Sequence, residues 1–303
     1  MTTARKPFLG TLNPKGIPYL LAVYFFWGST YLAIRIAVRG GDGMPPFMLG
    51  VIRTGIAGTI LLTWSYFRYK SIRLTKTEFI VNAISGTLLW VGGNGLVNFA
   101  EQRAESGYAA LLVGALPLWV TIMEGIIDRK VPTLKLVGAL VIGFLGLGVL
   151  LFPVIQHGDS GDILSAVALL AAPLCWGAGS ILMQRKKSSL PSLTSSAYQH
   201  LFGFVAMSIV SLLSGETLHP LPLEIWLAVG YLIVAGSIIA YTSYLTSLTL
   251  LPISVVTTYA YVNPVIAVLL GWLLIDEPVS GWTLGGMALI IAGVVGVFHE
   301  KRK

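Results

Sequence analysis

Charged residues are scarce in this chain. Asp, Glu, Lys and Arg make up 11% of its 303 residues, whereas about a quarter of an ordinary soluble domain is charged. This scarcity excludes an assembly of ordinary soluble domains. The single cysteine, Cys175, excludes an internal disulfide bond, so cysteine usage says nothing about the redox compartment.

Motifs for several kinds of chemistry are also absent. The sequence has no Gly-x-x-x-x-Gly-Lys-[Ser/Thr] loop, which argues against ATP hydrolysis by this chain. It has no His-Glu-x-x-His, no Cys-x-x-Cys and no cluster with metal-ligand spacing. We therefore expect no cofactor, no metal and no enzymatic activity. An intramembrane enzyme and a non-transporting membrane scaffold or regulator are the alternatives to the function inferred below.

Long apolar stretches fill the chain instead, and hydrophobic residues form 55% of it. A helix needs about 20 mostly apolar residues to cross a bilayer, whereas barrel strands alternate over about ten residues. The stretches therefore predict an all-α membrane protein with ten transmembrane helices, the first retained and not cleaved as a signal. The ten expected spans are residues 17–38, 46–67, 79–99, 107–127, 134–152, 163–184, 194–213, 225–246, 253–275 and 282–298.

Basic residues are unevenly divided between the two sides of the predicted bundle. Sixteen of the 20 lie in segments on the side of the N-terminus, two (Arg39 and Arg103) lie in loops on the opposite side, and two lie within spans. Because short loops rich in Lys and Arg stay in the cytoplasm, both termini are predicted to be cytoplasmic in a bacterial-type plasma membrane, the inner membrane. The net charge of +7 thus reflects topology, and we expect no nucleic-acid partner.

The two halves of the chain resemble each other. Because five helices are an odd number, the second copy would begin on the opposite side of the membrane, and the halves would be inverted repeats. We expect one five-helix repeat over residues 1–152 and the other over 153–303. The matching positions are Trp27-Gly28 with Trp176-Gly177, Pro117 with Pro264, Gly138 with Gly285, and Gly146 with Gly293.

Several segments carry a family resemblance over nearly the whole chain. They are Trp27-Gly28-Ser29-Thr30-Tyr31 through Arg35, Arg53, Gly93-Asn94-Gly95 through Glu101, Ala115-Leu116-Pro117, Trp176-Gly177, Gly236-Ser237-Ile238-Ile239, Tyr259-Ala260-Tyr261-Val262-Asn263-Pro264, and Asp276-Glu277-Pro278 to Gly285-Gly286 and Gly293. With these segments the chain resembles the EamA group of the drug/metabolite transporter superfamily, in particular its PecM/YedA-like branch. One departure is Asp128-Arg129-Lys130, where the family often has Gly-Glu after the fourth span.

The resemblance implies a secondary transporter that exports small organic metabolites or drugs, amino acids among them, by alternating access. Protons or a counter-substrate would be the coupling partners, and we expect a monomer in the lipid bilayer. The residues themselves do not distinguish metabolite efflux from broad drug efflux.

Three charged residues lie in or near the spans, where charge is costly. Arg53 lies about seven residues into the second span. Arg35 and Glu101 lie at similar depth at the ends of spans 1 and 3, so we expect them to form an ion pair. That pair would act as an outer gate or proton-linked site, or would simply lock two helices together.

Polar and aromatic side chains recur at helical spacing inside the spans. We expect them to line a substrate cavity; packing between helices is the alternative. Aromatic faces suit planar, apolar or cationic solutes, and Arg53 could hold a carboxylate. Gln199 occupies about the repeat position of Arg53. The predicted cavity residues are Trp27, Thr30, Tyr31, Arg53, Asn94, Asn98, Trp176, Gln199, Tyr241, Tyr244, Tyr259 and Asn263.

Helix-breaking residues also occupy matching positions. Pro117 and Pro264 lie about ten residues into their spans, where each removes a backbone hydrogen bond. We expect a hinge at each proline, with a static kink as the alternative. The glycines of spans 5 and 10, Gly138, Gly143, Gly146, Gly285, Gly286, Gly293 and Gly296, are expected to permit close helix packing.

Overall fold

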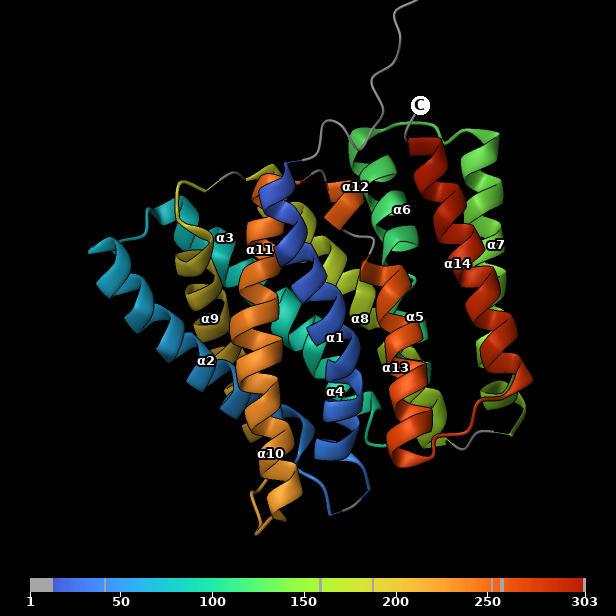
Figure 1. Ribbon diagram of the computed structural model, residues 1–303, viewed down its shortest axis with the longest axis horizontal. Helices are drawn as coiled ribbons and strands as arrows, with labels where there is room; N and C mark the ends of the chain where they lie inside the picture. Colours follow the sequence, from blue (N-terminus) through green and yellow to red (C-terminus); the bar gives the residue numbers. More distant parts are fainter. Residues whose placement is uncertain are drawn as a thin grey trace, which may run out of the picture.

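The structure is a computed structural model that describes residues 13–40, 42–157, 160–186, 188–251, 253–256 and 259–301. All regular secondary structure in these ranges is helical (Figure 1). The elements are η2 (Pro14–Gly16), α1 (Ile17–Val38), α2 (Pro46–Tyr69), α3 (Lys76–Thr87), η3 (Leu88–Gly95), α4 (Leu96–Ala100), α5 (Ser106–Val113), α6 (Leu116–Asp128), α7 (Leu134–His157), α8 (Ser160–Arg185), α9 (Ser192–Leu213), α10 (Leu223–Tyr231), η4 (Leu232–Tyr241), α11 (Thr242–Leu250), α12 (Ile253–Val256), α13 (Tyr259–Ile275) and α14 (Gly281–Lys301).

The helices have the length and composition of membrane spans. In the described part of the chain, eight helical stretches are long and apolar enough to cross a bilayer, and two shorter apolar helices, Val262–Ile275 and Gly281–Gly296, follow them. The all-α membrane fold predicted from hydropathy is therefore confirmed.

Spans 3 and 8 each contain a π-helical segment that hydropathy did not predict. Leu88–Gly95 (η3) lies between α3 and α4, and Leu232–Tyr241 (η4) lies between α10 and α11. A π-helix has wider turns than an α-helix, so it changes where the backbone carbonyls point, and such segments are frequent at functional sites. The two segments occupy matching places in the two repeats.

The two prolines differ in their effect on the helices. The fourth span breaks between α5 and α6, and Pro117 lies in the first turn of α6, where a missing N–H costs nothing. Pro264 lies within the continuous helix α13. The expected hinge at Pro117 therefore coincides with a helix break, whereas the one at Pro264 does not.

Helices of one half pack mainly against helices of the other half. The pair α2 and α9 and the pair α7 and α14 each join equivalent spans. Helix α1 packs on α13 and η4, and its repeat mate α8 packs on α6 and η3. This pairing is the one that an inverted two-fold repeat requires, because each contact occurs twice with the halves exchanged.

The glycines of α7 and α14 have unequal roles. A Cβ atom at Gly293 would lie 2.5 Å from the Cα atom of Gly143, and one at Gly146 would lie 2.7 Å from the backbone nitrogen of Ile290. These glycines let the two helices approach closely. Nothing lies within 4 Å of a Cβ atom built at Gly138, and Gly285 has only one neighbour, at 3.8 Å. The expectation of close packing was therefore wrong for these two.

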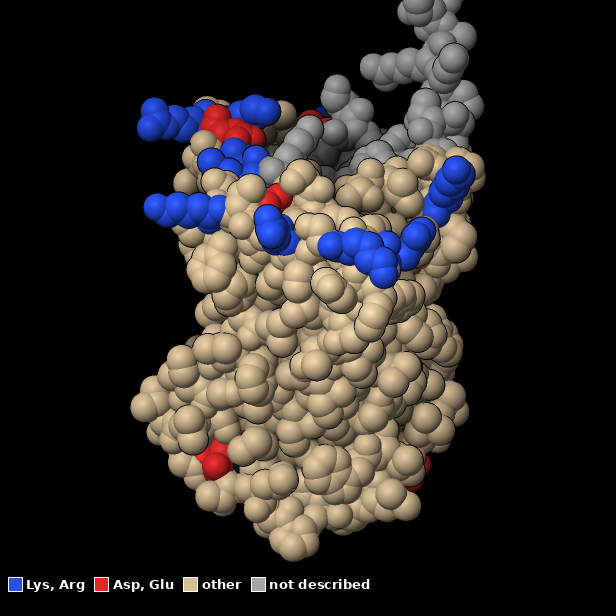
Figure 2. Space-filling model, turned by 90° about the vertical axis from the view of Figure 1, so that its left-hand side faces the viewer, with Lys and Arg blue, Asp and Glu red and all other residues tan. Residues whose placement is uncertain are grey.

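Charged side chains collect at the two ends of the bundle. Figure 2 shows Lys and Arg gathered toward one end of one face, with an uncharged zone across its middle. The start of α1 and the end of α14 lie at this same end (Figure 1), which we call the basic end. Its basic residues with described side chains are Lys15, Arg68, Lys70, Arg73, Lys76, Arg129, Lys130, Lys135, Arg185 and Lys186. The opposite, acidic end carries Glu101, Glu105, Asp162, Glu216, Glu224, Asp276 and Glu277.

Two basic residues at the acidic end have acidic neighbours. Arg39 lies 3.7 Å from the carboxylate of Glu224, and Arg103 lies 3.9 Å from that of Asp162. The positive charge of each of these two residues is thus partly neutralised by a nearby carboxylate.

Candidate substrate cavity

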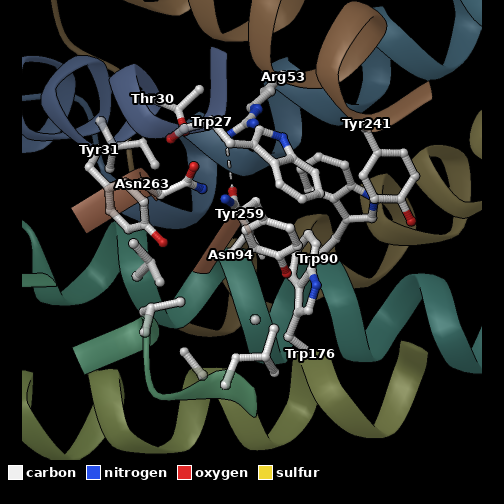
Figure 3. Close-up of a pocket in the computed structure, with 16 residues that line it drawn as sticks. Trp27, Thr30, Tyr31, Arg53, Trp90, Asn94, Trp176, Tyr241, Tyr259 and Asn263 are labelled. Carbon is white, nitrogen blue, oxygen red and sulfur yellow. Dashed lines mark hydrogen bonds between the residues drawn. The ribbon is translucent and has the colours of Figure 1, made fainter. Parts of the chain in front are cut away.

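A cavity of about 70 Å³ lies between the two halves, where side chains from both repeats converge (Figure 3). Nine of the 12 predicted cavity residues line it: Trp27, Thr30, Tyr31, Arg53, Asn94, Trp176, Tyr241, Tyr259 and Asn263. The other lining residues, which the sequence analysis did not identify, are Ile34, Trp90, Gly93, Val97, Val113, Leu116 and Ala172.

Trp27 and Trp176 hold equivalent places on opposite halves. Their rings lie 5.5 Å apart, edge to face. The indole N–H of Trp27 donates to the carbonyl of Gly236 in η4 at 3.1 Å. A Cβ atom at Gly93 in η3 would lie 2.7 Å from the Trp176 ring. Each tryptophan therefore contacts a glycine in the π-helical segment of the other half.

Tyrosine rings complete an aromatic wall around Trp27. The ring of Tyr244 lies 5.0 Å from that of Trp27, and the ring of Tyr259 lies 5.1 Å away. Tyr241 lies 6.4 Å away, with its ring tilted. Such a wall presents π-faces and ring edges to a planar solute, and each well-placed aromatic pair contributes about 0.5–1.5 kcal/mol beyond burial.

Arg53 brings a buried positive charge to the cavity. Its side chain is 2% exposed; its Nε donates to Ser237 Oγ at 2.7 Å, and its Nη1 donates to Asn94 Oδ1 at 3.2 Å. The guanidinium also lies 5.1 Å from the centre of the Trp90 ring. No carboxylate of the described residues lies within ion-pair distance of it. A buried cation without a carboxylate partner favours a bound anion.

Three predicted cavity residues do not line the cavity. The amide nitrogen of Asn98 donates to the carbonyl of Pro46. Gln199 accepts a hydrogen bond from the hydroxyl of Tyr241 at 2.5 Å and donates to Ser85. Tyr244 donates to Ser180 Oγ at 3.2 Å and touches Trp27 through its ring. These residues connect helices through the hydrogen bonds named here, and Asn98 Oδ1 is buried without a partner in the described structure.

Trp90 is the principal residue missed. It precedes Asn94 by one helical turn and is 1% exposed, with its ring 5.3 Å from that of Tyr241. Its spacing of four residues from Asn94, which places both on one helix face, was the available signal. The aliphatic lining residues gave none, because any of them could equally face lipid.

Arg35 and Glu101 are adjacent but do not form the predicted ion pair. Arg35 Nη1 donates to the backbone carbonyl of Glu101 at 2.6 Å. The carboxyl group of Glu101 is fully buried, and neither of its oxygens has a hydrogen-bond partner in the described structure. The prediction of an Arg–carboxylate contact was therefore wrong, although the two residues do meet at the acidic end.

Glu277 ties the two halves together nearby. It follows α13, and its carboxylate accepts hydrogen bonds from the backbone N–H and the hydroxyl of Ser106, at 2.8 and 2.6 Å, and from the N–H of Gly107 at 3.3 Å. A carboxylate at the start of α5 satisfies free N–H groups and suits the positive end of the helix dipole. We call this contact the Glu277 tether.

The position equivalent to Glu277 in the first half is Lys130. Helices α6 and α13 end alike, since Arg129 and Asp276 follow them with left-handed backbones, at φ values of 52° and 54°. The next residue is basic in one copy and acidic in the other. The basic end therefore has no carboxylate at this position.

No group of three or more His, Cys, Asp or Glu side chains within the described ranges could hold a metal ion.

The geometry defines an all-α membrane protein of two inverted five-helix repeats, with an aromatic and cationic cavity between them.

Comparison with known proteins agrees with this class. The sequence profile of the EamA-like transporter family matches residues 14–152 and again residues 163–299. The chain belongs to the EamA-like transporter family, and it is a membrane transporter.

Relatives and a solved structure cover most of the chain. The Uncharacterized inner membrane transporter YedA of Escherichia coli is 36% identical over 93% of this chain and 90% of its own length. Protein PecM of Dickeya dadantii is 25% identical, covering 91% and 92%. The S-adenosylmethionine/S-adenosylhomocysteine transporter of Chlamydia trachomatis is 24% identical, covering 91% and 87%. One solved structure has the same fold, with a TM-score of 0.68 and 20% identity over 95% of this chain and 99% of that one.

Proposed function

We propose that this protein exports small organic solutes by alternating access through the cavity between its repeats. The observation that carries the proposal is the location of the cavity, whose walls come from both halves. In transporters built from inverted repeats, a site at the repeat interface opens to one side and then to the other as the halves move. The cavity is complete within one chain, so a monomer suffices.

The preferred solute is a carboxylate that carries a planar ring. The aromatic wall suits the ring, and Nη2 of Arg53, the guanidinium nitrogen that donates to neither Ser237 nor Asn94, suits the carboxylate. Because Arg53 is buried beside the wall, an organic cation would be repelled from the same place. The chlamydial relative is named for S-adenosylmethionine and S-adenosylhomocysteine; both molecules contain a planar base and a carboxylate, and S-adenosylmethionine also carries a sulfonium cation, so S-adenosylhomocysteine fits this class better.

Transport requires the cavity to expand. A volume of about 70 Å³ holds roughly two water molecules at ~30 Å³ each, whereas ligand pockets occupy ~300–1,000 Å³. Val113 and Leu116, on either side of the break between α5 and α6, line the cavity. This break is therefore our candidate hinge, and Pro264 would act as the point on which α13 rocks.

The basic end is proposed to face the cytoplasm, with the protein in a bacterial inner membrane. The gathering of Lys and Arg at that end supports this orientation. In a Cys175→Ser background, an impermeant maleimide added to intact cells should label Ser280→Cys at the acidic end and spare Ser71→Cys at the basic end. The reverse pattern would show that the orientation is wrong.

Three indoles test the substrate class, because they share a ring and differ in charge. Tryptophan carries a carboxylate and an amine, indole-3-propionate carries only the carboxylate, and tryptamine carries only the amine. In proteoliposomes of the purified protein, the two carboxylates should move faster than tryptamine. Arg53→Ala should lower their flux roughly ten- to a hundredfold, because a hydrogen bond to a charged group contributes about 1.5–3 kcal/mol. Arg53→Lys, which keeps the charge but loses the fork, should fall between.

Controls separate binding from folding. Each variant should unfold at a temperature close to that of the unaltered protein, which shows that it is intact. An equal loss for all three indoles would make Arg53 a structural residue. Folded protein that moves none of a wider panel of amino acids, nucleosides and organic cations would favour a scaffold or regulator instead.

A further inference from the structure

A cluster of three carboxyl groups and one guanidinium lies at the acidic end, next to the cavity. Glu101 and Glu105 lie in the loop between α4 and α5, and Glu277 comes from the loop after α13. Arg35, near the end of α1, interacts electrostatically with both Glu101 and Glu105. The cluster therefore joins the first half of the chain to the second.

The two buried carboxyl groups have opposite surroundings. The oxygens of Glu277 accept three hydrogen bonds from Ser106 and Gly107. Those of Glu101 accept none, and Arg35 donates to the carbonyl of Glu101 although the carboxyl group belongs to the same residue. An ionised carboxylate buried without donors is very costly. A guanidinium would also pair with such a carboxylate in preference to a carbonyl. The arrangement is that of a protonated acid.

Charge balance gives the same result. Three carboxylates facing one guanidinium leave excess negative charge, and a bound proton removes part of it. Burial, and next the charge of Glu277, raises the pKa of Glu101 well above that of an ordinary glutamic acid, and Arg35 offsets this only in part. Burial and Glu277 also raise the pKa of Glu105.

The remaining polar neighbours do not neutralise Glu101. Tyr31 interacts electrostatically with it from α1 but carries no positive charge. Arg103 lies in the same loop but lies 3.9 Å from Asp162, at the start of α8. Arg35 is therefore the cation best placed to receive the charge of Glu101.

We propose that Glu101 binds the coupling proton of this transporter, and that Arg35 becomes its counter-ion when the proton leaves. This inference rests on the proposed transport function. In the protonated state the guanidinium holds the carbonyl of Glu101. When the carboxyl O–H bond breaks, the proton passes to water and the new carboxylate draws the guanidinium from the carbonyl to itself.

Tyr31 links this event to the cavity. It lines the cavity wall, interacts electrostatically with Glu101, and precedes Arg35 by one turn of α1. A movement of Arg35 between two acceptors therefore shifts the part of α1 that touches the solute. Proton uptake from outside would exchange for solute, so that a proton gradient drives export.

Infrared spectroscopy tests the proton site without any substrate. A protonated carboxyl group has a carbonyl-stretch band separate from those of amides and carboxylates. In the purified, reconstituted protein, titrated from about pH 5 to about pH 9, this band should disappear through a transition above the ordinary value of ~4.3. The spectra are recorded in a Glu105→Gln background, which removes the other carboxyl group with a raised pKa, and in that background Glu101→Gln should abolish the transition. Glu105→Gln alone should retain it, and Arg35→Gln should move it to higher pH because the counter-ion is gone.

The proposal fails if the transition persists in the Glu101→Gln, Glu105→Gln double variant, disappears in Glu105→Gln alone, or moves to lower pH in Arg35→Gln. It also fails if the unaltered protein shows no such band. None of these results depends on transport, so the proton site and the proposed function can fail separately.

Transport supplies the second readout. With tryptophan or indole-3-propionate as the probe, an imposed proton gradient should drive accumulation by the unaltered protein. Glu101→Gln should lose this accumulation while it still exchanges labelled for unlabelled probe, because a neutral amide mimics the protonated acid. Gradient-driven accumulation equal to that of the unaltered protein would overturn the proposal. Failure of the unaltered protein to move either probe would count against the substrate class alone.

Discussion

Arg53 and Glu101 are both buried ionisable residues, but their surroundings favour opposite charge states. Arg53 has Ser237 and Asn94 as acceptors and the Trp90 ring beside it. The carboxyl oxygens of Glu101 have no donor. Interactions of this kind stabilise a guanidinium as an ion, whereas their absence favours a neutral acid.

The state of Glu101 should appear in the pH dependence of stability. Its raised pKa means that the folded protein keeps a proton that the unfolded chain releases above about pH 4.3. This contribution to stability is complete below that pH and is lost as the pH rises through the folded-state pKa. We therefore expect Glu101→Gln to gain apparent melting temperature relative to the unaltered protein between about pH 5 and about pH 8. Thermal unfolding in detergent measures this, and parallel curves for the two proteins would contradict it.

Among individual residues, helical spacing predicted much of the cavity lining. Residues such as Trp27, Tyr31 and Arg35, one turn apart, had to share a face of α1. Spacing did not predict which acceptor Arg35 would use. The carboxyl group and the backbone carbonyl of Glu101 are close together, so a small movement of the Arg35 side chain exchanges one acceptor for the other. Helical spacing also did not distinguish Arg53, which lines the cavity, from Gln199, which does not.

At the scale of elements, the π-helical segments shape the cavity most. Each brings a glycine against a tryptophan of the other half, and η3 carries Asn94 while η4 carries Ser237. Hydropathy predicted the two spans but not these segments, since a run of apolar residues has the same average in either kind of helix. The helix break before Pro117 was easier to predict, because proline removes a backbone donor.

Gly236 offers a test of the η4 segment. A Cβ atom there would lie 2.8 Å from both Arg53 Nη2 and Thr30 Cγ2, so Gly236→Ala should displace the guanidinium and lower the flux of indole carboxylates roughly tenfold. Gly230→Ala is the matched control, because it lies in the same span and nothing lies within 4 Å of its Cβ position. Reconstituted flux measures both variants. Equal activity would show that Arg53 tolerates the crowding.

For the whole molecule, the repeat and the distribution of charge were the predictable features. Matching Trp-Gly pairs and the alternation of basic loops depend only on residue order, which the sequence contains in full. The Glu277 tether could not be predicted, because it joins loops that are 171 residues apart.

A reversible cross-link tests whether the acidic end must open. A Cβ atom at Gly107 on α5 would lie 3.5 Å from Cβ of Val268 on α13, within the range for a disulfide. In a Cys175→Ser background, oxidation of the Gly107→Cys, Val268→Cys pair should block most of the flux. Reduction should restore it, and each single variant should be unaffected by oxidation. Full flux in the oxidised pair would show that α5 and α13 need not separate.

The Glu277 tether has no acidic counterpart at Lys130; at the basic end the halves are joined elsewhere, where Glu78 accepts hydrogen bonds from Ser188 and Ser189 and Asp128 pairs with Arg185. Parting the halves at the acidic face breaks three hydrogen bonds that have no equivalent at that position on the other face. In the proposed transport cycle, the difference between the contacts at the two ends sets how long the empty protein rests in each state, yet by thermodynamic necessity it cannot make solute flow uphill. Uphill flow has to be driven by an ion or a counter-substrate moving down its own gradient.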